Sequence, residues 1–225
     1  MDLEALREEL DHLLFLACSG QVFAEPPLDQ TPEHLRRLND IAFSGDGEPT
    51  SFPKFVEACH IAVSLLEKHQ RQDVKIVTIT NATLFHQKRV MEALAYLDEH
   101  NGEIWAKLDA GTEAYYRQIE RTSIPLGRVL ENILAAGRLR PIVIQSLFLR
   151  LDGQGPPPDE IDAFVQRLTE LVAGQCQIKL VQVYTVARST AVAACTPLPA
   201  AQLDAISEQV RRATGLMVET YYGPS

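Results

Sequence analysis

Cysteine is scarce in this sequence, and its four residues are scattered. Cys18, Cys59, Cys176 and Cys195 are far apart, so the chain contains neither a CxxC pair nor a CxxxCxxC group. Closely spaced cysteines are the usual sign of a zinc or iron–sulfur site. We therefore predict no metal ligands and no disulfide framework, and we interpret each cysteine as a small, mostly buried thiol.

Long apolar runs and an excess of positive charge are also missing. No apolar stretch approaches the ~20 residues of a membrane-spanning helix, and the acidic, amphipathic start MDLEALREELDHLL does not resemble a signal peptide. The net charge of −9 argues against a broad nucleic-acid-binding surface. The six histidines show no metal-binding spacing. We expect a cytoplasmic protein that does not use a membrane.

Apolar strands alternate with amphipathic helices along the chain. Near-continuous apolar strands are typical of parallel sheets that are buried on both faces, so we predict one α/β domain spanning residues 1–225. An open doubly wound sheet and a full or partial barrel both fit this pattern, and both place ligands at the carboxyl ends of the strands. The predicted strands are 41–43, 74–80, 103–108, 141–149 and 178–186, with a short one at 216–221. The predicted helices are 2–16, 52–68, 84–99, 113–120, 126–137, 159–173 and 199–214.

The first strand runs into the glycine-rich stretch SGDGEPT. Glycines allow a ligand to approach the main chain, and a carboxylate beside free N–H groups suits a ligand that carries both an ammonium and an anion. Asp-Gly between apolar runs also indicates a hairpin turn, but the helix that follows favours a ligand-binding loop. The residues of this loop that we expect to contact a ligand are Gly45, Asp46, Gly47, Glu48, Pro49 and Thr50.

Polar residues recur where the later strands end. Because such residues are costly to bury unless they are paired, their recurrence indicates a shared polar cavity. Simpler interpretations remain for some of them: Lys107 and Asp109 could pair with each other, Asn81 could cap a helix, and Arg188 could be a surface residue. The candidate site residues are Asn81, Lys107, Asp109, Gln145, Tyr184 and Arg188, accompanied by Thr80, Gln182 and Thr185.

The stretch from Phe43 to Thr50 resembles the glycine–glutamate motif of radical S-adenosylmethionine (AdoMet) enzymes, in which this loop binds the amino group of AdoMet. The resemblance extends from about Asn39 to the C-terminus. It implies a partial TIM-type (βα) barrel of parallel strands. It also implies that Lys107 and Asp109 lie near the ribose and carboxylate of AdoMet, and that Gln145 and the stretch 183–188 lie around the nucleoside or the substrate.

One departure from this family is large. In these enzymes a CxxxCxxC loop after the first strand holds a 4Fe–4S cluster, which cleaves AdoMet to a 5′-deoxyadenosyl radical that abstracts hydrogen from a substrate. This sequence has no such loop and starts with a helix. Two explanations compete: the first βα unit is missing from a truncated chain, which we favour, or the protein is a cluster-free AdoMet- or partner-binding module. In either case we expect no AdoMet cleavage by this chain alone.

A third hypothesis is an ordinary α/β enzyme or a phosphate-binding protein. The acidic loop disfavours a phosphate ligand, and the sequence has no GxSxG nucleophile motif. The substrate, whether a small molecule or a protein, is not named by any motif. A missing first βα unit would expose an apolar sheet edge, so a homo-oligomer formed through that edge is also expected.

Overall fold

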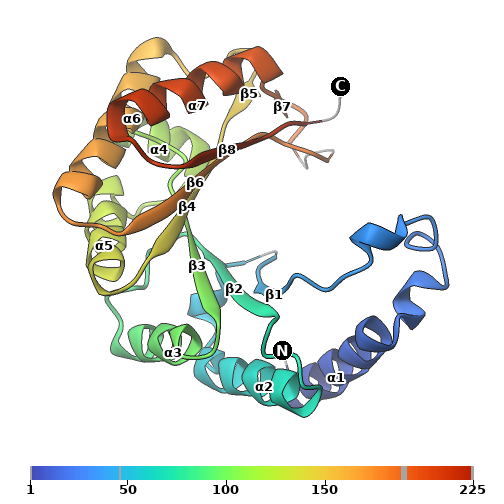
Figure 1. Ribbon diagram of the computed structural model, residues 1–225. Helices are drawn as coiled ribbons and strands as arrows, with labels where there is room; N and C mark the ends of the chain where they lie inside the picture. Colours follow the sequence, from blue (N-terminus) through green and yellow to red (C-terminus); the bar gives the residue numbers. More distant parts are fainter. Residues whose placement is uncertain (1, 46, 189–191, 224–225) are drawn as a thin grey trace. The chain divides into compact units, whose positions relative to one another are not determined.

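A computed structural model describes residues 2–45, 47–188 and 192–223. Figure 1 shows the helices and strands of the chain. The chain divides into two compact units. The first unit comprises Met1–Ile79 and Gln87–Glu103. The second unit comprises Thr80–His86 and Ile104–Ser225.

The first unit pairs two parallel strands with helices. Ile41 of β1 lies opposite Ile76 of β2, and Phe43 lies opposite Thr78. The ring of Phe43 meets the buried ring of Phe55 edge to face, with 5.6 Å between centroids. The helices and strands are α1 (Leu3–Ser19), β1 (Asp40–Phe43), α2 (Phe55–Lys68), β2 (Lys75–Thr80) and α3 (Lys88–Asp98), with short 3-10 turns at Gln21–Phe23, Glu33–Leu35 and Pro49–Ser51.

Two details of the first unit correct the sequence prediction. Helix α2 begins at Phe55, three residues later than predicted, because Phe52 precedes a proline and is held in an extended conformation. In α1 the spacing of the leucines in the sequence predicts one apolar stripe that includes both Leu13 and Leu14. Only Leu14 is buried, whereas Leu13 is 57% exposed, because neighbouring residues of a helix point about 100° apart.

The second unit carries four parallel strands in the order β3–β4–β6–β8. Figure 1 shows α5, α6 and α7 gathered on one side of β4, β6 and β8. Helix α7 ends at Gly215, which takes the left-handed conformation expected of a C-terminal glycine cap. The elements are β3 (Gly102–Lys107), α4 (Glu113–Glu120), α5 (Leu126–Leu139), β4 (Ile142–Leu147), β5 (Leu149–Leu151), α6 (Pro158–Ala173), β6 (Ile178–Tyr184), β7 (Cys195–Pro197), α7 (Ala200–Thr214) and β8 (Val218–Tyr221).

One face of the strands of the second unit is lined by buried apolar residues. Their buried residues include Ile144 on β4, Val181 and Val183 on β6, and Val218 on β8. Helix α7 approaches this face, because the hydroxyls of Ser207 and Thr220 are 2.8 Å apart and Arg211 donates to the carbonyl of Val218. Side chains alternate between the two faces of a strand, so the residues between these positions form the opposite face.

Strands β5 and β7 were not predicted. Leu149 was assigned to the end of the preceding strand and residues 188–199 were expected to be irregular. Instead, Leu149–Leu151 pairs in antiparallel fashion with Cys195–Pro197. Each strand has only three residues, too few to show the alternation from which a strand is recognised.

Candidate functional site

A row of polar side chains crosses the strands of the second unit. Lys107 lies opposite Gln145, Gln145 opposite Gln182, and Gln182 opposite Glu219. Register partners in a parallel sheet project from the same face, so these four side chains share the face opposite the apolar one. The amide of Gln145 donates to Oε1 of Gln182 over 3.1 Å, and the hydroxyl of Tyr221 donates to Glu219 over 2.5 Å. We call Lys107, Gln145, Gln182 and Glu219 the polar row.

Asp109 and Tyr184 lie on the carboxyl-terminal side of the polar row. Asp109 is 2% exposed, and its Oδ1 accepts a hydrogen bond of 2.8 Å from the backbone N–H of Leu147. Its Oδ2 is 3.0 Å from Nζ of Lys107. The Asp109 charge raises the pKa of Lys107, against the effect of burial. Burial, followed by the Asp109 charge, raises the pKa of Tyr184, which keeps its hydroxyl protonated.

Glu120 joins this group from the last position of α4. Its Oε1 is 3.8 Å from Nζ of Lys107, and its side chain is 21% exposed. Burial raises the pKa of Glu120 to about 7, the Asp109 charge adds to this increase, and Lys107 opposes it. Glu120 therefore exchanges its proton near neutral pH, which an ordinary glutamate does not do.

Hydrogen bonds to Glu160 of α6 fix the loop between β3 and α4. The fixed loop positions Asp109, which lies in it, and Glu120, which lies at the end of α4. The buried carboxylate of Glu160 accepts from the N–H of Gly111 and from the hydroxyl of Thr112, over 2.5 Å and 2.6 Å. Thr112 in turn caps α4. A Cβ at Gly111 would lie 2.0 Å from the backbone nitrogen of Phe164, so only glycine lets this loop approach α6 so closely.

In the first unit, the glycine loop after β1 leaves its main chain open. Gly45 has a φ of +132°, and a Cβ added at Gly45 or Gly47 would meet nothing within 4 Å. Oε1 of Glu48 accepts from the N–H and the hydroxyl of Thr50, over 3.1 Å and 2.5 Å. Pro49 occupies the first position of the 3-10 turn that Glu48 caps.

Arg89 of α3 fixes the end of this loop. Its guanidinium donates to the backbone carbonyls of Thr50 and Phe52, over 3.0 Å and 3.1 Å. Thr50 is completely buried. The loop is therefore held at its carboxyl-terminal end, while the main chain at its two glycines stays open.

The remaining predicted site residues have different surroundings. Asp46 lies outside the described residues. Asn81 does not cap a helix, because its Oδ1 accepts from the N–H and the hydroxyl of Thr83, closing a turn six residues before α3 begins. Asn132 of α5 supports that turn by donating to the carbonyl of Ala82. Arg188 is exposed beyond β6.

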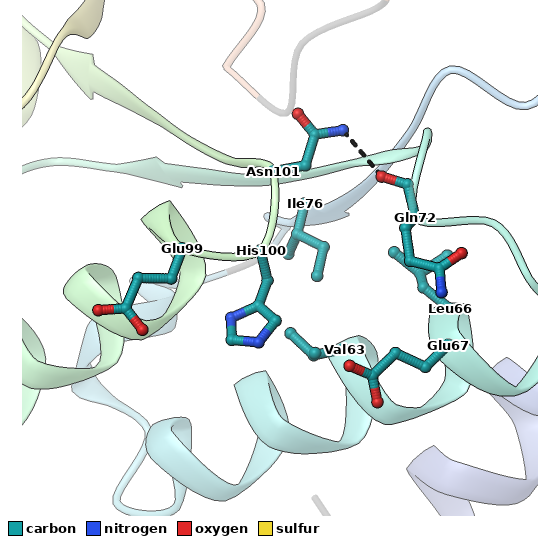
Figure 2. Close-up of a pocket in the computed structure, with 8 residues that line it drawn as sticks. All are labelled: Val63, Leu66, Glu67, Gln72, Ile76, Glu99, His100 and Asn101. Carbon is teal, nitrogen blue, oxygen red and sulfur yellow. Dashed lines mark hydrogen bonds between the residues drawn. The ribbon is translucent and has the colours of Figure 1, made fainter.

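A cavity of about 190 Å³ lies elsewhere in the first unit (Figure 2). It is lined by Ile76 near the start of β2, by His100 after α3 and by the carboxylates of Glu67 and Glu99. Nδ1 of His100 lies 2.7 Å from the carbonyl of Tyr96. This cavity is at the amino end of β2, whereas the glycine loop follows the carboxyl end of β1, so we do not assign the predicted ligand to it.

The sequence analysis did not predict two residues of these sites, Glu120 and Arg89, for different reasons. Glu120 carried a usable signal, because an acidic residue in the last turn of a helix opposes the helix dipole. Arg89 carried none: it lies 39 residues from Thr50, and only the fold brings the two together. Lys107 and Asp109 pair with each other, as the simpler interpretation of these two residues expected, and the Asp109 charge also acts on Tyr184.

Two solved structures resemble this chain, although no protein-family model and no curated protein sequence matches it. The first is a radical SAM methyltransferase from Sphaerobacter thermophilus, with a TM-score of 0.57 and 16% identity over 82% of this chain and 51% of that one. The second is TYW1 with a lysine-pyruvate adduct bound, with a TM-score of 0.51 and 16% identity over 94% of this chain and 63% of that one. This chain therefore spans about half of the first structure and under two thirds of the second.

At 16% identity these matches establish the fold. The predicted fold class, α/β with parallel strands in a partial TIM-type (βα) barrel, is confirmed. The likeness to radical SAM proteins that the glycine loop indicated is confirmed at the same level. Among the helices of the described residues, none is both long and apolar enough to cross a membrane.

Proposed function

We propose that this chain binds S-adenosylmethionine and that the glycine loop after β1 contacts its methionine amino group. The open space beside Gly45 and Gly47 is the observation that carries the proposal. It leaves room for a ligand against the main chain, and the half-buried Glu48 follows Gly47 directly in the chain. A carboxylate next to exposed backbone polar groups suits the ammonium and carboxylate of an amino acid moiety.

The polar residues of the second unit are proposed as a further ligand-binding site, considered within that unit by itself. Lys107 and Asp109 supply a cation and an anion 3.0 Å apart, which suit charged and polar groups of a ligand. Gln145 and Tyr184 offer neutral donors and acceptors for a nucleoside or a substrate. Asn81 and Arg188 complete the proposed set.

The residues of this chain do not fit a 4Fe–4S cluster. Such a cluster is held by closely spaced thiolates, and the sequence has none. Cys59 and Cys176 are buried, and burial raises the pKa of the Cys176 thiol to about 11 and that of Cys59 to about 12. In the described part of the chain, no three potential ligands gather at one point. We therefore propose binding of AdoMet by these 225 residues without its cleavage by them alone.

A partner-binding module without catalysis is the second candidate function. The four separated cysteines favour it over a complete radical enzyme, because a chain that only binds needs no cluster ligands. The two candidates differ in one respect that can be measured, since a module that binds only a partner protein does not need AdoMet.

Calorimetric titration of the purified chain with AdoMet tests the proposal. Gly47→Val adds a side chain in space that is open in the protein, so the variant should fold normally and bind AdoMet at least about tenfold more weakly, a loss of about 1.4 kcal/mol. Gly127→Val is the matched control, because Gly127 also has open space around it but lies on the exposed surface of α5. Equal affinity in Gly47→Val, or no binding by the unmodified chain, would refute the proposed function.

A further inference from the structure

Two carboxylates share one lysine at the end of the polar row. Nζ of Lys107 lies 3.0 Å from Asp109 and 3.8 Å from Glu120, and neither carboxylate has a second ion-pair partner among the described residues. Oδ2 of Asp109 is buried, and although the ammonium is at ion-pair distance, no hydrogen bond of ordinary geometry reaches this oxygen. With both carboxylates ionised, the cluster therefore carries one negative charge that the protein does not neutralise.

Within the part of the chain that the structure describes, the surroundings of Glu120 do not supply the missing positive charge. The groups that act on it are Lys107 and Asp109 from β3 and its loop, Tyr184 from β6 and Tyr116 from its own helix. Burial raises the pKa of both tyrosines, so they are neutral near pH 7. Glu120 also stands at the carboxyl end of α4, where the helix dipole is negative. In the absence of a ligand, a proton on Glu120 provides the neutralisation.

We propose that Glu120, with Lys107 and Asp109, forms a proton-linked site for a positively charged group of the ligand, of the ammonium or sulfonium class. A cation that enters the cluster takes the place of the proton, which leaves the Glu120 carboxyl for the solvent. This inference rests on the proposed function for the identity of the ligand. The polar row begins at Lys107 and ends at a third carboxylate, Glu219, so a positively charged ligand that lies along the row meets negative charge at both ends.

The positive group could come from two sources. One is the sulfonium of AdoMet itself, and the other is an amine on a second ligand. S-Adenosylhomocysteine separates them, because it keeps the amino acid, ribose and base of AdoMet and lacks the sulfonium charge. As the amine probe we choose 1,4-diaminobutane, added to protein that is saturated with S-adenosylhomocysteine.

The experiment is calorimetric titration at pH 6, 7 and 8 in two buffers with different ionisation enthalpies, which yields the affinity and the number of protons released. A carboxyl that titrates near pH 7 is about one tenth ionised at pH 6 and about nine tenths ionised at pH 8, so the cation should bind up to about tenfold more tightly at pH 8. Glu120→Gln should lose both the pH dependence and the proton release. Glu131→Gln, which alters an exposed glutamate of α5, should keep both.

Each outcome has a definite meaning. Proton release with AdoMet but not with S-adenosylhomocysteine supports the inference and identifies the sulfonium. Proton release only with the diamine, and its loss in Glu120→Gln, supports it and identifies an amine ligand. The inference is overturned if neither probe releases protons, or if Glu120→Gln retains the pH dependence.

If AdoMet does not bind at any pH, the proposed function fails, and the diamine titration alone decides the inference. Because proton release is measured on the unmodified chain, a misfolded variant would not prevent the test.

Discussion

The half-buried Glu120 should make the unfolding free energy of this protein fall as the pH rises. Its pKa is raised from 4.5 in the unfolded chain to about 7 in the folded protein. Between these values the folded state binds more protons than the unfolded state, so stability is present at low pH and is lost as the pH rises through 7. A shift of this size corresponds to about 3 kcal/mol between pH 4.5 and pH 8.

Glu120→Gln removes this titration while keeping the shape of the side chain. The variant should match the unmodified protein near pH 5 and exceed its unfolding free energy by about 3 kcal/mol at pH 8. The difference between the two proteins isolates Glu120, because groups outside the cluster titrate alike in both. The assay is urea unfolding followed by circular dichroism at pH 5, 6, 7 and 8.

The contrary result is equally clear. If the two stability curves run parallel between pH 5 and pH 8, Glu120 is ionised in the folded state at pH 5 and the charge count of the cluster is wrong. Glu131→Gln serves as the control, because its carboxylate is 77% exposed and should leave the pH profile unchanged.

Three further predictions test contacts inside each unit. Gly111→Ala should cost at least about 2 kcal/mol, because its Cβ would lie 2.0 Å from the backbone of Phe164; thermal unfolding measures this. Arg89→Ala removes two hydrogen bonds from a charged donor and should lower the unfolding free energy by about 2 kcal/mol. The amide hydrogen-exchange rate of Thr50 should increase under conditions in which the protein stays folded. Glu160→Leu leaves the N–H of Gly111 without its buried acceptor and should cost about 2 kcal/mol, seen as a lower urea midpoint.

The sequence was most informative where a pattern is local. The helix Glu113–Glu120 was predicted with the same bounds as the structure shows, because Thr112 supplies a cap and a glycine precedes it. The strand pattern located β1 and β2 of the first unit and β3, β4, β6 and β8 of the second unit, which pair in parallel within each unit. It missed β5 and β7, whose pairing joins segments more than 40 residues apart, since no local signal marks such short strands.

For the candidate site, too, local patterns could be predicted from the sequence, whereas contacts between distant segments could not. Parallel strands bring their carboxyl ends to one edge, so Lys107, Asp109 and Tyr184 could be grouped from their positions in the sequence. Their charge balance could not, because it depends on Glu120, which α4 carries back to Lys107. The single apolar stripe expected in α1 failed at Leu13 for a related reason, since exposure depends on what packs against a helix.

The sequence by itself determined the α/β class, the order of the helices and strands, and the position of the glycine loop, because these depend on residue periodicity and on the backbone freedom of glycine. Only the tertiary structure decided which groups neutralise one another. The charge of a carboxylate depends on its burial and on its neighbours within a few ångströms. For Glu120 those neighbours come from β3 and β6, and only folding places them there.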